Sequence, residues 1–351
     1  MIVATTLSGS AYGISNDNGE VIWSLYLGEE STPFRDQLMN PKIPLYIMRS
    51  TNYFQYPSQA AIVCNVQDSR KSKIVFFNPI TGSMVNAIQM DDLKRVEMMP
   101  FANAEMLHPL LIVRADDKLE FHPSIEADYT PPYPIHLMFL EKQSLLRGVQ
   151  VDFQKRVLIE NWKSDLGFTS PAEKIVKVAA KSNSQKVHSQ GKVLGENSAL
   201  QIRQSQPGCF GCSRRGALLA YRFPAGFCLW SSGESFPPRH PRSHSPVNLV
   251  HCENWLVYTY WNVKARRTEL GVVELYEGLE QTNSKNFNSY TTLKHPLTVF
   301  AQSYIFSQGV AAMAVSETEQ GLTTRSVIIA MPFGGVLEMS RRLIDARRPW
   351  N

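Results

Sequence analysis

The chain has 351 residues, of which 43% are hydrophobic and 19% are charged, and this is the composition of a globular protein, not of a disordered or fibrous one. No window holds the roughly 18 uncharged apolar residues of a membrane span, and the N-terminus lacks the basic, apolar and small-residue order of a secretory signal. Six arginines against one glutamate within residues 200–246 account for the whole net charge of +5. The remaining chain is neutral, so nucleic-acid binding is not expected.

The first two dozen residues predict three short strands. Residues 1–7 and 11–15 are apolar runs separated by a Ser-Gly-Ser turn, and the run at 21–23 follows an Asn-Gly pair that ends at Gly19. Because glycine takes positive φ at little steric cost, this turn fixes the hairpin register and sends Trp23 to one face of the sheet. We expect the Trp23 ring to pack between adjacent sheets.

The same order of apolar strand, polar turn with glycine and second strand returns twice. It is found at residues 73–85 and 135–149, in which Gly82 and Gly148 are the predicted turn glycines. The spacing from Gly19 to Gly82 to Gly148 corresponds to about one to two propeller blades of ~40 to 45 residues.

Further strands are predicted along the rest of the chain, whereas convincing helices are scarce. The predicted strands are residues 110–113, 256–261, 271–276 and 326–331, with 262–267 as a polar hairpin connection. Residues 338–346 are compatible with one or two short helical turns. Repeated hairpins over this length favour an all-β propeller over a single sandwich.

The residue types of common active sites occur without the spacing that chemistry needs. Cys209 and Cys212 form a C-x-x-C pair, but a structural zinc ion needs four ligands and no second pair follows, so a metal or redox role is not expected. His188 lies in a polar stretch that lacks the Gly-x-Ser-x-Gly elbow of a hydrolase. Asp116 and Asp117 follow an apolar run and are interpreted as an exposed hairpin turn instead of a catalytic pair.

Nucleotide-binding loops are also absent from the sequence, since neither the P-loop pattern nor Gly-x-Gly-x-x-Gly occurs. Two basic pairs, Arg341-Arg342 and Arg347-Arg348, flank Leu343-Ile344 near the C-terminus. Such pairs are usually solvated, although near an anionic membrane each charge could gain about 1 kcal/mol, and we expect solvation. The sequence therefore predicts no catalytic, cofactor-binding or metal-binding residue.

Several stretches resemble a known family in their order along the chain. Residues 9–23, in which Asn-Gly-Glu-Val-Ile-Trp closes a Tyr-Gly-Ile strand, resemble the blade repeat of quinoprotein-type (PQQ-like) propellers. Residues 247–278 are similar to subunit 1 of the endoplasmic reticulum membrane protein complex, the EMC. Further similar stretches follow the order of that family: residues 175–195, 302–306, 321–326 and 343–349.

The resemblance implies the luminal C-terminal part of a large membrane-anchored subunit, with PQQ-like propeller blades at residues 1–170 and an EMC subunit 1 C-terminal-type domain at 171–351. It implies a non-catalytic luminal scaffold in the endoplasmic reticulum membrane, without a cofactor. The complex supports insertion of tail-anchored and multipass proteins, so the expected partners are other EMC subunits and nascent clients. We expect the earlier blades and the single membrane helix of the family to be missing from this chain.

Residues 200–246 depart from the family pattern. They hold one β-branched residue, Ile202, and are rich in Pro, Gly, Ser and Arg, a composition that resists strand formation. Reverse translation of residues 200–212 with a one-nucleotide shift can give a segment close to the family's own. We therefore expect this aberrant segment to be disordered or translated out of frame, in which case Cys209 and Cys212 are artefacts.

Two other functional classes stay open. One is a PQQ-dependent dehydrogenase-like enzyme, for which no ordered set of calcium ligands with a tryptophan floor is found, and the other is a soluble propeller adaptor. For the scaffold, the strand at residues 255–261 and the basic tail at 341–348 are the predicted subunit contacts, through exposed hairpins and strand edges.

Overall fold

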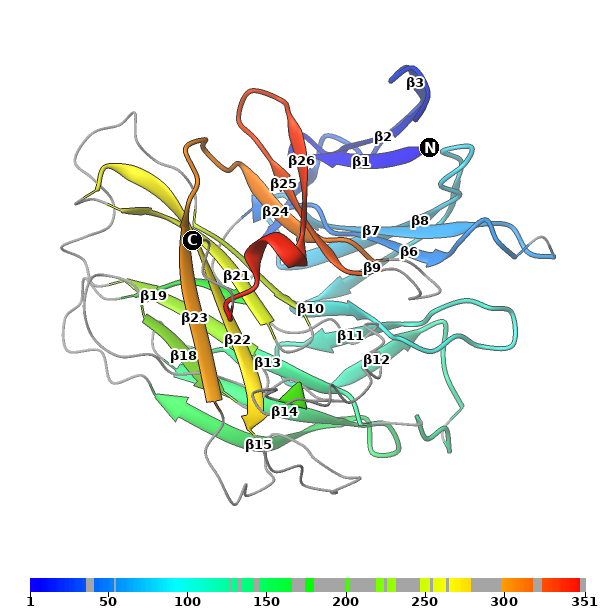
Figure 1. Cartoon of the computed structure of the whole chain (residues 1–351). Helices are drawn as coiled ribbons and strands as arrows, with labels where there is room; N and C mark the ends of the chain where they lie inside the picture. Colours follow the sequence, from blue (N-terminus) through cyan, green and yellow to red (C-terminus); the bar gives the residue numbers. More distant parts are fainter. Residues whose placement is uncertain are drawn as a thin grey trace. The chain divides into compact units, whose positions relative to one another are not determined.

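The computed structural model describes residues 1–35, 41–53, 55–126, 128–131, 134–141, 145–165, 174–179, 200–201, 219–223, 226–231, 247–252, 255–262, 265–278, 298–317 and 324–347. These residues form 26 strands and one 3-10 helix, η1 (Arg341–Ile344) (Figure 1). The strands pair in antiparallel sheets, so the predicted all-β class is confirmed. Contacts divide the chain into two units, Met1–Ile135 with Val149–Glu160, and His136–Gly148 with Asn161–Asn351.

The first unit contains three of the described sheets. The first sheet is β1 (Ile2–Thr6), β2 (Ser10–Ile14) and β3 (Val21–Tyr26). The second has the order β5 (Pro41–Lys42), β4 (Ser31–Arg35), β7 (Gln59–Val66), β8 (Lys71–Phe77) and β9 (Met84–Asp91), with β6 (Leu45–Arg49) also paired to β7. The third is β10 (Leu93–Met98), β11 (Leu110–Arg114) and β12 (Leu119–His122).

The second sheet of this unit is buried on both faces. On one face, a core cluster joins Ile62 of β7 and Phe77 of β8 to Ala11 and Trp23 of the first sheet. On the other face, a second cluster joins the alternate β7 and β8 residues to the third sheet, as with Phe76 and Ile112. Successive strand residues point to opposite faces, so the nearly continuous apolar runs of β7 and β8 supply both clusters.

Trp23 packs between the first two sheets, as the sequence predicts. Its Nε1 donates a hydrogen bond to the carbonyl oxygen of Pro79 at 3.1 Å, and its ring meets the Phe77 ring edge-on at 5.7 Å between centroids. A Cβ built on Gly13 would lie 2.1 Å from Trp23 Nε1, and one built on Gly82 would lie 2.6 Å from Cδ2. Two glycines therefore make room for the ring.

The second unit contains three sheets with described strands. The first is β16 (Lys174–Ala179), β19 (Gly226–Ser231) and β18 (Leu219–Phe223). The second is β20 (Asn248–Cys252), β21 (Trp255–Asn262), β22 (Arg267–Gly278) and β23 (Thr298–Ile305), with β17 (Leu200–Gln201) also paired to β22. The third is β24 (Ala312–Val315), β25 (Ser326–Ala330) and β26 (Val336–Ser340). A further sheet of β13 (His136–Leu140), β14 (Leu145–Asp152) and β15 (Val157–Asp165) has residues in both units.

The core of the second unit lies on one face of the β20–β23 sheet. Register pairs Trp255 with Glu274 and Val257 with Val272, and β23 adds Phe300 opposite Glu274. Residues of β25 and of η1 complete this cluster: Val327, Ile329 and Ile344. We call this side of the β20–β23 sheet its core face.

Two sequence predictions need correction. Gly148 is not a turn residue, because it lies inside β14, where a Cβ would meet the Trp162 ring 2.0 Å away. Residues 338–340 are not helical, because they pair with β25 as part of β26, and the helix is limited to η1. By contrast, the predicted turn at Asp116 and Asp117 is confirmed, with Asp117 at a φ of 62° between β11 and β12.

Candidate functional site

Glu274 is a carboxylate on the apolar core face of the β20–β23 sheet. It lies on β22, which pairs with β21 on one side and β23 on the other, and no part of the residue is exposed to solvent. A buried carboxylate is costly unless it is paired and hydrogen-bonded. The groups that pair with the Glu274 carboxylate and donate hydrogen bonds to it therefore define a structural site.

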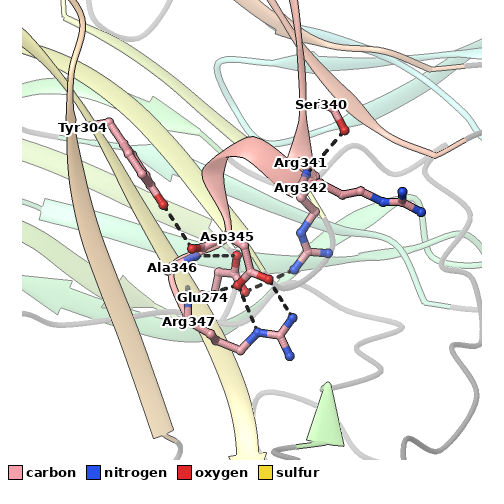
Figure 2. Close-up of polar contacts among 8 residues, drawn as sticks. All are labelled: Glu274, Tyr304, Ser340, Arg341, Arg342, Asp345, Ala346 and Arg347. Carbon is pink, nitrogen blue, oxygen red and sulfur yellow. Dashed lines mark hydrogen bonds and ion pairs between the residues drawn. The ribbon is translucent and has the colours of Figure 1, made fainter. Parts of the chain in front are cut away.

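Two partners of Glu274 come from the C-terminal segment. Arg341 Nη2 lies 3.3 Å from Glu274 Oε2, and the backbone N–H of Ala346 donates to Oε1 at 3.3 Å (Figure 2). The Arg341 guanidinium also lies over the Trp255 ring, 5.7 Å from its centroid. A planar cation is thus held between a carboxylate and an indole, an arrangement suited to arginine.

Residues 341–347 lie across the sheet, and we call them the C-terminal strap. Ser340 caps η1 by accepting a hydrogen bond from the Arg342 N–H, and Ile344 is buried at the end of the helix. Beyond η1, Tyr304 Oη of β23 donates to the carbonyl oxygen of Asp345 at 3.0 Å. The strap is therefore held by residues of β21, β22 and β23. Figure 2 shows the contacts with Glu274 and Tyr304.

Asp345 is stabilised in its ionised form by the neighbouring Arg347. Burial opposes ionisation, but two guanidinium nitrogens of Arg347 lie 3.0 and 2.9 Å from the carboxylate oxygens and the Arg347 N–H donates to Oδ1. These donors hold the pKa of Asp345 below its usual value. Burial, followed by the charges of Asp345 and Glu274, raises the pKa of the Tyr304 hydroxyl, which stays a donor.

A second polar cluster lies on the opposite face of β21 and β22. Glu269 is 6% exposed and accepts hydrogen bonds from Tyr260 Oη at 2.6 Å, Asn262 Nδ2 at 3.1 Å and Arg267 Nε at 2.9 Å. Burial alone would raise the pKa of Glu269, but these three donors outweigh it and lower the pKa. Burial and the carboxylate raise the pKa of Tyr260 to about 12. This cluster ties the end of β21 to the start of β22, beside the turn that joins them.

Neither cluster has the arrangement of a catalytic centre. Within the described ranges, no group of three or more His, Cys, Asp or Glu side chains could hold a metal ion. Each carboxylate of the two clusters accepts hydrogen bonds from donors of the same chain, so the geometry supports attachment of chain segments to one another. In the same ranges, no helix is both long and apolar enough to cross a membrane.

Comparison with known protein families identifies the family to which the chain is related. A family model described as ER membrane protein complex subunit 1, second beta-propeller, matches residues 1–201 and 236–351. The chain belongs to this family. The predicted family and the predicted incomplete β-propeller are confirmed, and among the described strands no sheet closes on itself.

Curated members of the EMC subunit 1 family match over nearly the whole chain. The Gallus gallus protein is 30% identical over 367 residues, which cover 99% of this chain and 36% of that protein. The Xenopus laevis protein is 31% identical over 373 residues, which cover 99% of this chain and 35% of that protein. The Schizosaccharomyces pombe protein is 33% identical over 104 residues, or 28% of this chain and 12% of that protein. The chain spans about a third of the length of the first two relatives.

The family match leaves out residues 202–235, which lie inside the aberrant segment. Strands β18 and β19 are described within that segment and pair with each other. The out-of-frame origin stays a prediction, as does a domain boundary after residue 170. Cys209, Cys212 and His188 lie outside the described residues.

The structure corrects the predictions for two residues of the contact regions in this EMC subunit 1 family member. Trp255 is only 1% exposed and belongs to the core, whereas Tyr258, Tyr260 and Trp261 of the same strand are half-buried, and a contact through residues 255–261 stays a prediction. Arg341 is not a solvated cation, because it pairs with buried Glu274, whereas Arg342 is exposed as predicted. Arg347 is exposed but is bound to Asp345, and Arg348 lies outside the described residues.

Sequence reasoning missed Glu274, the centre of the site. The signal was present as a single acidic residue within the apolar run Gly-Val-Val-Glu-Leu-Tyr of the predicted strand. A lone charge in a strand that is apolar on both faces indicates a buried partner. Its partner is 67 residues further along the chain, so the sequence did not identify it.

Proposed function

We propose that the chain is a non-catalytic scaffold region of an EMC subunit 1, on the luminal side of the endoplasmic reticulum membrane. In this role it supports insertion of tail-anchored and multipass proteins by holding other EMC subunits in place. The observation that carries the proposal is the family match over residues 1–201 and 236–351. The relatives from Gallus gallus and Xenopus laevis bear the name of a subunit of this complex.

The geometry of the two polar clusters agrees with a scaffold role. The buried carboxylates Glu274 and Glu269 join segments of one chain, and Trp23 is enclosed between two sheets. Sheets that are packed on both faces leave strand edges, turns and exposed side chains as the surfaces for partners. Arg342 and Leu343 on the outer side of η1 are such exposed residues.

Purification of the tagged chain from its own cells tests this proposal. The chain is expressed with an affinity tag, membranes are solubilised in a mild detergent, and co-purifying proteins are identified by mass spectrometry. We expect the other EMC subunits in near-constant ratio to the chain, together with protection of the tag from protease in sealed microsomes. Recovery of the chain from the cytosolic fraction without those subunits would support the soluble adaptor instead.

A second measurement addresses the insertion role directly. In cells that lack subunit 1, expression of the gene that encodes this chain should restore membrane insertion of a tail-anchored reporter. A secreted reporter serves as the control, because its translocation needs no insertion of this kind. Assembly with EMC subunits but no restored insertion would reject the insertion role while leaving membership of the complex intact.

A further inference from the structure

The C-terminal strap contacts the sheet through side chains and backbone groups from both of its ends. Arg341 meets Glu274, Ala346 N–H donates to the same carboxylate, and Tyr304 Oη donates to the Asp345 carbonyl oxygen (Figure 2). Arg341 also lies over the Trp255 ring. Ile344 and Ala346 are its two buried residues, at 2% and 6% exposure. These contacts come from three different strands, so the strap can dock only after the sheet has formed.

The sheet beneath the strap is held far more extensively. Strand β22 pairs with β21 over eight residues and with β23 over eight residues, and its core-face side chains are buried. In the strap, by comparison, Arg342, Leu343 and Arg347 are exposed. Segments outside the paired strands with exposed side chains open at lower free energy than strands that are paired on both sides.

Arg341 joins the strap to the buried carboxylate of Glu274. When the strap is closed, the Arg341 guanidinium and the Ala346 N–H both meet the buried carboxylate of Glu274. Removing one partner of a buried ion pair leaves an uncompensated charge, which favours entry of water and departure of the covering segment. Loss of Arg341 therefore acts on the strap through Glu274 and through the contact with the Trp255 ring.

We propose that residues 341–347 open and close as a unit on the core face of the β20–β23 sheet, with the Arg341–Glu274 pair as the clasp. In the closed state, the clasp holds residues 341–347 on the sheet. In the open state, these residues leave the sheet while β20–β23 keep their pairing. Arg341 is a positioning residue in this device, and the inference does not depend on the proposed function.

Hydrogen exchange measured by mass spectrometry on the purified 351-residue chain tests the proposal. Arg341→Ala should increase the exchange rate of amides 344–347 by about tenfold or more, whereas amides of β21 and β22 should exchange at the wild-type rate. The neighbouring exposed arginine supplies a matched control, since Arg342→Ala should leave strap exchange unchanged. Arg341→Lys should fall between the two, because an ammonium keeps the charge but not the planar contact with Trp255.

Glu274→Gln provides an independent variant that keeps the side-chain volume. It should also accelerate exchange of the strap, and trypsin should cleave after Arg347 faster than in the wild type, with the sheet intact by circular dichroism. Wild-type exchange of the strap in Arg341→Ala or in Glu274→Gln would show that the pair is not the clasp. Equal acceleration in the strap and in β21–β22 would show that the strap does not open on its own, and would overturn the proposal.

Discussion

Trp23 is enclosed by two glycines that have different backbone conformations. Gly82 has a φ of +71° and lies at the turn between β8 and β9, whereas Gly13 lies within strand β2. At both positions, an added Cβ would overlap the indole. Gly19 has nearly the same φ as Gly82, at +75°, but nothing lies within 4 Å of its added Cβ. Comparing substitutions at Gly82 and Gly19 therefore separates the cost of steric overlap with Trp23 from the cost of backbone strain.

Gly82→Ala should destabilise the chain by about 2–4 kcal/mol, because it combines overpacking against Trp23 with an unfavourable positive φ. Gly19→Ala should cost only about 1 kcal/mol of stability, since the positive φ is unfavourable for alanine but the added Cβ meets no other atom. Urea unfolding followed by circular dichroism measures the difference between the two midpoints. Equal costs for the two variants would show that the Trp23 ring moves aside without a penalty.

Glu269 gives a pH-dependent contribution whose sign follows from its lowered pKa. The folded pKa lies below the unfolded value of about 4.3, so the ionised carboxylate stabilises the fold above that pH. This stabilisation is lost as the pH falls through the folded pKa. Glu269→Gln should therefore be less stable than the wild type at pH 7. The difference in unfolding free energy between the two proteins should become smaller as the pH falls below about 4.

Thermal unfolding of both proteins at a series of pH values checks this expectation. Glu338→Gln on β26 is the matched control, because Glu338 is exposed and should show no comparable gap at neutral pH. A gap between wild type and Glu269→Gln that stayed constant from pH 7 to pH 3 would contradict the assigned role of the carboxylate.

At the scale of elements, the sequence predicts strands well and their partners poorly. The opening hairpins and strands β11, β21, β22 and β25 are all found, because local alternation and turn residues determine them. Strand β22 is longer than predicted, since the register that pairs Asn262 with Arg267 extends it toward the turn. Residues 338–340 were predicted as helical because their composition is compatible with both states, and pairing with β25 decides the outcome.

Strand β22 should be sensitive to substitution, because it is paired on both sides and its side chains on the core face are buried. Leu270→Ala removes a side chain that is 1% exposed and should cost about 2–5 kcal/mol. Ile305→Ala on the neighbouring strand β23 removes a side chain that is 63% exposed and should change stability by less than about 0.5 kcal/mol. Denaturant midpoints measure both, and similar costs would mean that the two strands are equally buried in solution.

At the scale of the whole molecule, the family and the propeller class were predictable from the sequence, but the site was not. Blade-like hairpins and the similar stretch at residues 247–278 lie within continuous sequence, so they could be recognised directly. The pair of Arg341 with Glu274 joins residues that are 67 positions apart, and Arg341 resembles a solvated basic residue until the fold is known. Long-range pairing of this kind is a property of topology, which local patterns do not specify.

The segment that the family match omits gives a prediction about the gene. We expect long-read sequencing of the transcript across codons 199–247 to show a reading frame that restores the family sequence after a one-nucleotide shift. The unmatched residues 202–235 support this expectation. A transcript that encodes the segment as written, with codons that exclude the shifted frame, would show that the departure is genuine.

The glycines against which the tryptophan rings pack have a consequence for inherited variation. Gly13 and Gly148 each face an indole at about 2 Å from where a Cβ would stand. Every amino acid other than glycine carries that carbon, so no missense change at these codons is conservative, whatever the chemistry of the replacement. Population sequencing should therefore find these codons depleted of amino-acid changes, while silent changes accumulate at them normally.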